Sequence, residues 1–523
     1  MPRFGARGFG GGAGPMSPAL ALGLDIGTTN VKLALVAPDR RPRIVTRASA
    51  PHPTRRPRPG WAEQSPAAWW RAVGAVLGPA RHRLRDVVAV AISGQGSTFA
   101  LCDRDGTPQT EAVGWHDLRA AAELPAIERK FRPLLDQAHG NAIGDAPEPK
   151  LVWLARERPR EFPRGELALT AASVVGVRLG AEPALNEGDA GGWLSWDRHR
   201  VRWSTEIARH LGIEQLLPPV VRAGTLIGQV SSRSARETGI PAGTRVFAST
   251  TDVAAAALAA GVGRAGEVFF SKGTGGFVCC NVESIRDPRP LLALPFGRDG
   301  IVQLCGGTDT LGAAWDWCRG LVGGVDHDEA ERLASAAPPG SGGVVFLPWL
   351  QGAQHPVLEP NARAVALGLS LETTPGHLLR SVLEGTAIAL RQHLAIARSV
   401  AKGEFHLIVC SGGPTQNALW NRLDAAAAET AIVIAPETDA AVGSALIAGE
   451  AAGLWPSALA AGELLRAGAP VVEPEPELSL VAEHEADLTA KAQAAASGLF
   501  APLAEFRQVA SETNLNGRRR VRR

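Results

Sequence analysis

Residues 23–36 read GLDIGTTNVKLALV, and this stretch decides the predicted fold. An apolar strand ends at Asp25, a Gly-Thr-Thr turn follows, and a second apolar strand begins near Val31. Backbone N–H groups and small residues at such a turn can surround a phosphate group. The usual phosphate loop joins a strand to a helix and ends in Gly-Lys-Ser/Thr, whereas this turn joins two strands. The pattern therefore predicts a β-hairpin whose tip binds phosphate.

A second stretch repeats this pattern later in the chain. Residues 266–283, GEVFFSKGTGGFVCCNVE, again combine an apolar strand, a Gly-Thr-Gly turn and another apolar strand. Two similar hairpins in one chain suggest two related domains. If the domains face each other, both turns grip one polyphosphate from opposite sides. We therefore expect two lobes with a nucleotide between them.

Strand-like and helix-like segments alternate along most of the 523 residues, which predicts an α/β protein of more than one domain. Strands are expected at residues 20–26, 31–37, 87–93, 99–103, 246–250, 267–273, 277–283, 343–350 and 405–413. Helices are expected at residues 65–78, 148–159, 251–263, 376–401 and 417–430. The predicted domain organisation is a tail at 1–18, an N-terminal lobe at 19–262, a C-terminal lobe at 263–505 and a basic tail at 506–523.

Composition excludes several classes of function. The net charge of +2 is too small to indicate a nucleic-acid or membrane partner, and no run reaches the ~18 apolar residues of a membrane span. The Gly-rich start and the arginine-rich end are typical of solvated, disordered termini, with an RNA-binding or anion-binding arm as the alternative. None of the six cysteines shows a Cys-x-x-Cys spacing, which favours buried thiols in a reducing cytoplasm.

The ordered set of motifs resembles the FGGY carbohydrate kinases, which have two actin-like (ribonuclease H-like) lobes with a nucleotide and sugar cleft between them. The resemblance covers about residues 20 to 500. It rests on LGLDIGTTNVK, PGWAEQSPAAWW, AISGQGSTFALCDRDG, WHDLR, STTDVAAAALAAGV, SKGTGG, VLEGTAIALR and CSGGPTQNALWNRL. Within the family, the sequence looks most like the xylulokinase-like pentulose kinases.

Asp25 and Asp252 are expected to have different roles. Asp25 ends an apolar strand, where an unpaired carboxylate is costly to bury, and Mg²⁺ on the ATP phosphates removes that cost. The alternative is a turn-capping aspartate. The resemblance implies that Asp252 is the catalytic base for the sugar hydroxyl. Asp252 also begins an Ala-rich helix, so it is a candidate N-cap, and a helix dipole would weaken it as a base. A weak base still suffices to orient the hydroxyl in a loose transition state.

The resemblance also implies the nucleotide contacts. The residues expected to bind ATP are Gly27, Thr28, Thr29, Lys32, Gly273, Thr274, Gly312, Gly412, Gly413 and Asn417. Lys32 either approaches the phosphates or points to solvent. Lys272 stands where the family commonly has an apolar residue, and it is either a phosphate contact or an exposed charge. Gly412 and Gly413 let the backbone approach the adenosine closely.

The sugar contacts are expected from Gln95, Gly96 and Ser97, together with Asp252. Xylulokinase-like proteins commonly have Met-His-Gly after this glutamine, whereas this chain has Gly-Ser-Thr, and Val253 stands where a polar neighbour of the base is common. The acceptor therefore stays open. The WHDLR motif, with Trp115, Asp117 and Arg119, either orients the sugar or its strand or contains a structural Asp–Arg pair. Asp189 is expected to be structural or adjacent to the sugar.

These observations predict a cytoplasmic, ATP- and Mg²⁺-dependent kinase that transfers the γ-phosphoryl group to a hydroxyl of a small sugar. The resemblance favours a pentulose such as xylulose. Erythritol, glycerol, another polyol or a different ketose are alternative acceptors, and a non-catalytic sugar-binding protein is a further alternative. The expected partner is the sugar or polyol alone, without nucleic acid or membrane, and a homodimer is possible by family analogy.

Overall fold

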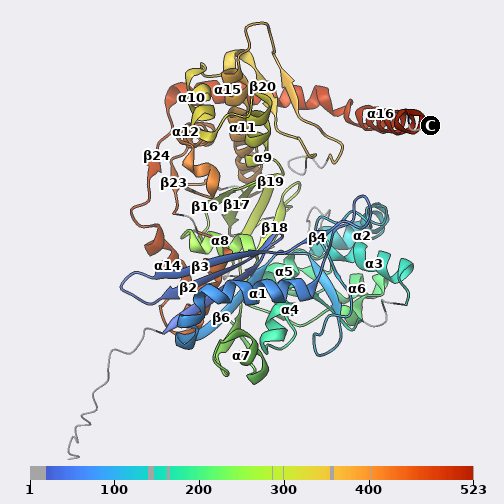
Figure 1. Ribbon diagram of the computed structural model, residues 1–523, viewed down its shortest axis with the longest axis vertical. Coiled ribbons are helices and arrows are strands. Elements are labelled where there is room, and N and C mark those ends of the chain that lie inside the picture. Colours follow the sequence, from blue (N-terminus) through green and yellow to red (C-terminus); the bar gives the residue numbers. More distant parts are fainter. Residues whose placement is uncertain are drawn as a thin grey trace, which may run out of the picture.

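Two lobes are stacked along the long axis of the computed structural model, with the N-terminal lobe below and the C-terminal lobe above in Figure 1. The structure describes residues 19–138, 146–160, 162, 165–285, 287–297, 300–353, 359–401, 403–436 and 438–521, with side chains to residue 510. The predicted N-terminal tail at 1–18 lies outside these residues. Among the described residues, no helix is long and apolar enough to cross a membrane.

The N-terminal lobe is built on a six-stranded sheet of order β14-β15-β6-β1-β2-β3. Its strands are β1 (Leu20–Ile26), β2 (Asn30–Ala37), β3 (Arg43–Pro51), β6 (Val87–Gly94), β14 (Leu226–Gln229) and β15 (Arg245–Ala248). The first three strands form an antiparallel meander, β6 runs parallel to β1, and β15 runs parallel to β6. Strand β1 is buried along its whole length, as its continuous apolar sequence predicts.

The C-terminal lobe repeats this arrangement in a seven-stranded sheet of order β18-β19-β17-β16-β22-β23-β24. Its strands are β16 (Glu267–Lys272), β17 (Gly276–Val282), β18 (Leu292–Pro295), β19 (Val302–Thr308), β22 (Leu407–Ser411), β23 (Ile432–Ile434) and β24 (Val471–Val472). Here β16, β17 and β19 form the antiparallel meander, and β22 and β23 add parallel strands. The predicted duplication is therefore present in the topology.

The register of the strands matches as well. Asp25 at the end of β1 pairs with Ser93 on β6, and Ser271 at the end of β16 pairs with Ser411 on β22. The two hairpin turns therefore leave their sheets at equivalent positions.

Two helices lie between the sheets, α8 (Asp252–Ala259) and α13 (Ala440–Ala452). One buried apolar cluster contains residues of both helices and of both sheets. A Cβ atom at Gly23 would lie 1.8 Å from the carbonyl oxygen of Ala441, and one at Gly443 would lie 1.8 Å from that of Ala255. These glycines let α13 pack directly against β1 and α8.

The remaining elements include a five-stranded sheet of order β4-β5-β8-β7-β9, three two-stranded sheets and the other helices. In the N-terminal half they are β4 (Thr54–Arg55), β5 (Glu63–Gln64), α1 (Pro66–Ala80), β7 (Phe99–Cys102), β8 (Ala112–Val113), α2 (Leu124–Ala138), α3 (Pro147–Glu157), β9 (Leu167–Thr170), α4 (Ala171–Leu179), β10 (Leu185–Asn186), α5 (Glu187–Gly191), β11 (Trp196–Asp197), β12 (Arg202–Trp203), α6 (Thr205–Leu211), β13 (Val220–Val221) and α7 (Ser232–Thr238). In the C-terminal half they are α9 (Gly312–Leu321), α10 (His327–Ala336), β20 (Val345–Leu347), β21 (Val365–Leu367), α11 (Pro375–Ala401), α12 (Ala418–Ala428), α14 (Ala458–Arg466), α15 (Pro476–Ser497) and α16 (Phe500–Val521).

The C-terminal segment differs from the expected disordered tail. Helix α16 continues through the arginine-rich end to Val521 and projects away from the upper lobe (Figure 1). The segment contains several Ala and Arg residues, which are good helix formers, so a basic tail of this composition can extend a preceding helix.

Candidate active site

The first predicted phosphate turn is the tip of the β1–β2 hairpin. The amide of Gly27 donates to the carbonyl of Asn30 (3.0 Å) and closes the turn. Thr29 is exposed, and Gly27 and Thr28 are partly exposed. Their backbone and hydroxyl groups are accessible to a ligand, as the sequence predicts for a phosphate turn.

Three side chains hold this turn from behind. The imidazole Nε2 of His52 donates to the carbonyl of Gly27 (2.9 Å), and the amide of Gln95 donates to the same oxygen (3.2 Å). The amide of Gln64 donates to the carbonyl of Thr28 (2.9 Å). These bonds fix the carbonyls of the turn on its inner side and so hold the turn in one conformation.

Trp115 and Trp69 extend this network. The indole N–H of Trp115 donates to the hydroxyl of Thr28 (3.2 Å), and the indole N–H of Trp69 donates to Gln64 (2.9 Å). Gln64 also accepts from the amide of Gln95 (2.7 Å). These polar groups are largely buried, so each bond prevents an unsatisfied group. Trp115 thus contacts the phosphate turn, a position that its motif did not reveal.

Asp25 and Lys32 face the same side of the hairpin, because they are directly opposite in the β1–β2 register. The hydroxyl of Ser93 donates to Asp25 Oδ1 (3.1 Å). Burial, together with the charges of Asp252 and Asp439, raises the pKa of Asp25 to about 7, although the ammonium of Lys32 opposes the increase. Lys32 also lowers the pKa of Asp252, so it lies near both carboxylates. The two acids therefore share one cleft.

The side chain of Asp252 does not cap helix α8. The hydroxyl of Thr251 occupies that role and accepts from the amide of Ala254 (3.2 Å). Asp252 Oδ1 accepts from the amide of Val253 (2.8 Å). Capping and catalysis therefore do not compete for one carboxylate, because the preceding threonine caps the helix. Burial raises the pKa of Asp252 to about 6, and the nearby charge of Asp189 adds to the increase.

The predicted sugar segment follows β6. Gln95 is buried, and its Oε1 accepts from the hydroxyl of Thr98 (3.1 Å). Both the oxygen and the nitrogen of its side-chain amide are therefore bonded within the protein. Ser97 adopts a left-handed backbone conformation (φ 58°). A Cβ atom at Gly192 would lie 2.8 Å from Ser97 Oγ, so the hydroxyl faces the end of α5. Gly96 is partly exposed beside it.

Asp189 on α5 lies near the catalytic candidate. The hydroxyl of Thr170 donates to Asp189 Oδ2 (2.8 Å), and the side chain of Asn186 caps α5 by accepting from the Asp189 amide (2.8 Å). Burial raises the pKa of Asp189 to about 7. Its charge reaches Asp252, so its place beside the sugar segment agrees with the sugar-adjacent alternative. Val253 packs against the apolar cluster between the lobes.

The second predicted phosphate turn is the tip of the β16–β17 hairpin. Gly273 and Thr274 are exposed. The carbonyl of Thr274 accepts from the amides of Leu311 (2.9 Å) and Ala313 (3.0 Å), and that of Gly273 accepts from the amide of Gly312 (3.0 Å). Gly312 is thus brought to the turn, where a Cβ atom would lie 2.6 Å from the Gly273 oxygen.

The predicted adenosine turn follows β22. A Cβ atom at Gly412 (φ 120°) would lie 1.8 Å from the carbonyl oxygen of Lys272, so this turn lies directly against the end of β16. Gly413 is exposed and has open space at its Cβ position. The side chain of Asn417 caps α12 by accepting from the amide of Trp420 (2.8 Å). The roles of these residues in binding ATP stay predictions.

The charge of Lys272 is not exposed, and its side chain does not project from the turn into solvent. Its side chain is fully buried and its ammonium donates to Asp424 Oδ2 at 2.5 Å. The ammonium also lies 4.6 Å from the ring centroid of Trp420. The exposed-charge alternative is therefore wrong, because the charge is neutralised inside the lobe, and the phosphate contact stays a prediction.

The WHDLR motif contains the structural pair. Arg119 donates to both oxygens of Asp117 (2.8 Å each) and to Glu63 (3.0 Å), and its guanidinium stacks over Trp61 at 3.9 Å. Asp117 also accepts from the amide of Ala62 (2.5 Å). These contacts therefore tie the WHDLR motif to residues 61–63, which lead into β5.

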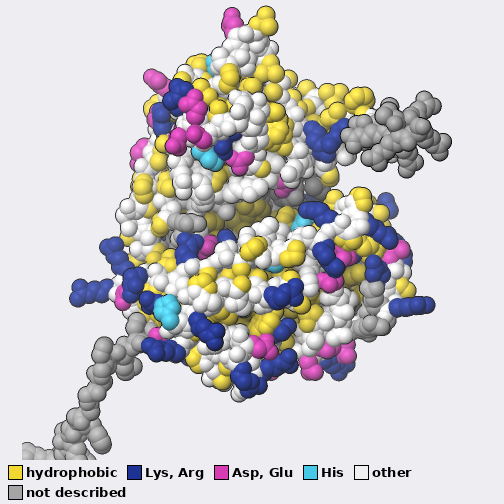
Figure 2. Space-filling model, viewed as in Figure 1, with side chains coloured by type: hydrophobic (Ala, Val, Ile, Leu, Met, Phe, Trp, Pro, Cys, Tyr) yellow, Lys and Arg dark blue, Asp and Glu magenta, His cyan; other side chains and the backbone are white. Residues whose placement is uncertain are grey.

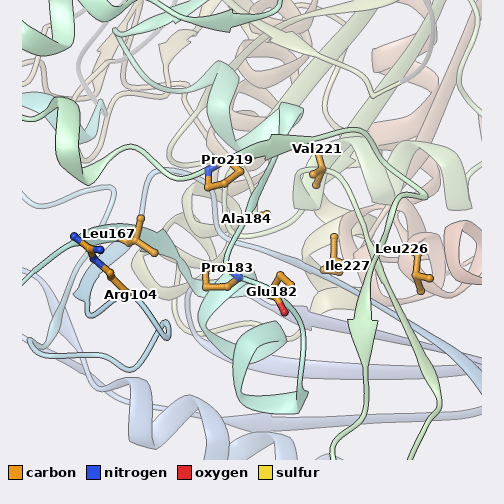
Figure 3. Close-up of a pocket in the computed structure, with 9 residues that line it drawn as sticks. All are labelled: Arg104, Leu167, Glu182, Pro183, Ala184, Pro219, Val221, Leu226 and Ile227. Carbon is orange, nitrogen blue, oxygen red and sulfur yellow. The ribbon is translucent and has the colours of Figure 1, made fainter.

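A groove of about 510 Å³ lies elsewhere on the N-terminal lobe (Figure 3). It is lined by Arg104, Leu167, Glu182, Pro183, Ala184, Pro219, Val221, Leu226 and Ile227. None of the predicted site residues belongs to this set. Asp25, Lys32 and Asp252 instead lie near one another, and a hollow between the two lobes is visible on the face shown in Figure 2.

The comparisons with known proteins agree with this geometry. Residues 20–259 match the N-terminal domain of the FGGY family of carbohydrate kinases, and residues 268–452 match its C-terminal domain. The chain belongs to the FGGY family of carbohydrate kinases. It is an ATP-dependent phosphotransferase with an alcohol group of a carbohydrate as the acceptor. The predicted actin-like fold and enzyme class are confirmed.

Individual relatives cover most of the chain. A xylulose kinase of Bacillus subtilis (strain 168) is 25% identical over 448 residues, which are 83% of this chain and 89% of that protein. A glycerol kinase of Thermococcus kodakarensis is 26% identical over 463 residues, 85% of this chain and 91% of that protein. The crystal structure of xylulose kinase from Rhodospirillum rubrum has a TM-score of 0.84 at 25% identity, covering 92% of this chain and 99% of that one.

Several site residues were not found from the sequence. His52 and Gln64 hold the first turn, and Asp439 raises the pKa of Asp25 from the start of α13. A signal for Asp439 exists, because Thr438-Asp439 precedes an Ala-rich run as Thr251-Asp252 does. His52 and Gln64 carry no such local signal, since their partners are backbone carbonyls of a distant hairpin.

Proposed function

We propose that this FGGY kinase phosphorylates a pentulose of the xylulose class at a hydroxyl group, with Asp252 as the catalytic base. The xylulose kinases among its relatives support this acceptor class. The observation that carries the proposed mechanism is that Thr251 caps α8 and leaves the half-buried Asp252 carboxylate in the same cleft as Asp25.

The proposed reaction proceeds in line across the cleft. The acceptor oxygen forms the new bond to the γ-phosphorus, the bond from that phosphorus to the β,γ-bridging oxygen breaks, and ADP leaves. The proton of the acceptor hydroxyl goes to the Asp252 carboxylate. The raised pKa of Asp252, about 6, makes it a better proton acceptor than a free aspartate while leaving it ionised at neutral pH. The turns at Gly27 and Gly273 position the phosphates.

Asp25 is the proposed contact for Mg²⁺, directly or through water. The charges of Asp252 and Asp439 both act on Asp25, and a cation reduces this repulsion. The described residues contain no cluster of three His, Cys, Asp or Glu side chains arranged to hold a metal by themselves. This suits Mg²⁺, which is commonly held by one or two carboxylates together with substrate phosphates. When bound, Mg²⁺ neutralises charge on the phosphates.

A polyol is the second candidate acceptor. The glycerol kinase relative is about as similar in sequence as the xylulose kinase relative. The sugar segment also has small residues, Gly96 and Ser97, and the neighbour of the base is the apolar Val253. A site with few hydrogen-bonding side chains discriminates weakly among hydroxylated acceptors.

An acceptor screen with ADP release as the readout tests this proposal. The panel is D-xylulose, other ketopentoses, erythritol and glycerol, each compared with a reaction that lacks an acceptor. We expect the highest kcat/KM for a ketopentose. A higher kcat/KM for a polyol than for a ketopentose would mean that the acceptor is a polyol. ADP release that no acceptor stimulates would overturn the proposal.

We also propose that the enzyme acts in the cytoplasm and that a homodimer forms, the latter by family analogy. All six cysteines are free and buried, which suits a reducing compartment. Light scattering at several protein concentrations measures the oligomeric state directly.

A further inference from the structure

We propose that the buried Lys272–Asp424 ion pair is a positioning device that fixes the second phosphate turn relative to the adenosine turn. This inference rests on the proposed binding of ATP between the lobes. Lys272 is the last residue of β16 and immediately precedes the Gly273-Thr274 turn. Asp424 lies on α12, the helix that follows the adenosine turn.

The main chain of Lys272 touches both segments. It closes the hairpin, because it pairs with Gly276 on β17. Its carbonyl oxygen fills the space where a Cβ atom at Gly412 would stand, 1.8 Å away. A small rotation of Lys272 therefore moves the phosphate turn and presses on the adenosine turn at once.

The side chain of Lys272 fixes that rotation through a directional contact. The ammonium donates to Asp424 Oδ2 at 2.5 Å and lies over the indole of Trp420, whose amide is bonded to the Asn417 cap. Neither the lysine nor the aspartate side chain is exposed. A direct contact with phosphate would require Lys272 to leave its buried partner.

Stability alone does not explain this pair. Asp424 Oδ1 is buried and has no hydrogen-bond partner among the described residues. Burial raises the pKa of Asp424, and the ammonium of Lys272 opposes that increase. Replacing a buried ion pair by apolar residues of similar volume is often neutral or stabilising. A pair that adds little stability but fixes one geometry suits a positioning role.

The decisive variant removes both charges, Lys272→Leu with Asp424→Leu. We expect the Kd for ADP, measured by calorimetry, and the KM for ATP to rise about tenfold, because small displacements of binding groups reduce affinity and rate strongly. The KM for the sugar should stay unchanged, since the sugar segment lies on the other lobe. The denaturation midpoint should stay the same or rise.

The matched control is the buried Arg380–Glu384 pair on α11, replaced by Arg380→Met with Glu384→Gln. This pair is also nearly unexposed, with Arg380 Nε 2.7 Å from Glu384 Oε1, but it contacts neither turn. We expect lower stability and an unchanged Kd for ADP. If the Lys272–Asp424 pair were only structural, its replacement would also leave the Kd for ADP unchanged.

An unchanged Kd for ADP in a folded double variant would overturn the inference. If that variant does not fold, Asp424→Asn keeps the shape of the partner and removes its charge, and the same two outcomes apply with a smaller rise expected. The result is separable from the proposed function. ADP binding can be measured even if no acceptor is phosphorylated, and an unaltered double variant would leave the kinase proposal intact.

Discussion

The two phosphate turns occupy equivalent positions in their sheets, yet different chemistry holds them. In the N-terminal lobe, neutral side chains such as His52 and Gln64 donate to the carbonyls of the turn. In the C-terminal lobe, backbone amides at the start of α9 donate to those carbonyls, and the buried Lys272–Asp424 pair lies beneath. The same topology thus accepts two solutions to one requirement, which is to fix the carbonyls of the turn.

The two central helices, α8 and α13, show a second difference. Each begins at a Thr-Asp sequence, but the capping residue is shifted by one position. Thr251 caps α8, and Asp252 is the first residue inside the helix. In α13 the cap is Asp439 itself, which accepts from the amide of Val442 and pairs with Arg47 at 2.7 Å. Two Thr-Asp sequences therefore give one aspartate that is committed to structure and one whose carboxylate faces the cleft.

The largest effect is expected from Asp252→Asn. Loss of the base should lower kcat by about 10²–10⁴-fold, while ADP still binds, because general-base catalysis contributes on that scale. The matched change Asp439→Asn should retain most activity and lower stability through the weakened cap and the lost ion pair. Steady-state kinetics, calorimetry and denaturation separate the two effects. Near-native turnover by the Asp252 variant would refute its role as the base.

The next effect is expected from Gly412→Ala at the adenosine turn. The added methyl group meets the Lys272 carbonyl and the backbone has φ 120°, so the turn must move, at a cost of about 1–3 kcal/mol or more. The KM for ATP should rise with it. Gly320→Ala on α9 is the control, because its Cβ position is open and it belongs to neither turn. Equal nucleotide affinity for both variants would show that the turn does not contact ATP.

Local features of the molecule were predicted from the sequence, and long-range ones were not. The strands of both hairpins and the helices that start near residues 65, 252, 376 and 417 were predicted because each carries an apolar run or a capping signal. Helix α13 was missed, since it is buried on all sides and has no amphipathic period. Lys272 and Asp424 lie 152 residues apart, so the sequence offered no reason to pair them.

The same contrast between local and long-range features holds for the candidate site. Asp25, Asp252 and the two turns were proposed as site residues because each motif is contiguous. The structure brings the two acids into one cleft, and their roles stay predictions. The supports of the first turn come from separate strands and were not identified. Asp189 was recognised only as structural or sugar-adjacent, since its influence on Asp252 depends on how α5 packs.

A smaller effect is expected from Gln64→Leu in the N-terminal lobe. The change leaves the Thr28 carbonyl and the Trp69 indole without their partner, which should lower stability by about 1–3 kcal/mol. The KM for ATP should rise because the first turn loosens, while the KM for the sugar changes less. Gln109→Leu at an exposed site is the control. An unchanged KM for ATP would show that the remaining supports of the turn suffice.

The smallest effect is expected from Asp189→Asn, and it concerns pH. Asp252 acts as a base only when ionised, so kcat should rise with pH through its pKa of about 6 and level off above it. Asp189 raises that pKa by charge repulsion, so its neutral replacement should move the acid limb to lower pH.

The displacement should be less than about one pH unit, because Asp189, with a pKa of about 7, is itself partly protonated where Asp252 titrates. The asparagine can still accept from Thr170, so the helix geometry is retained. A pH–rate profile of the variant beside that of the parent enzyme measures the direction. An acid limb that moves to higher pH would mean that Asp189 acts on the reaction through a contact other than its charge.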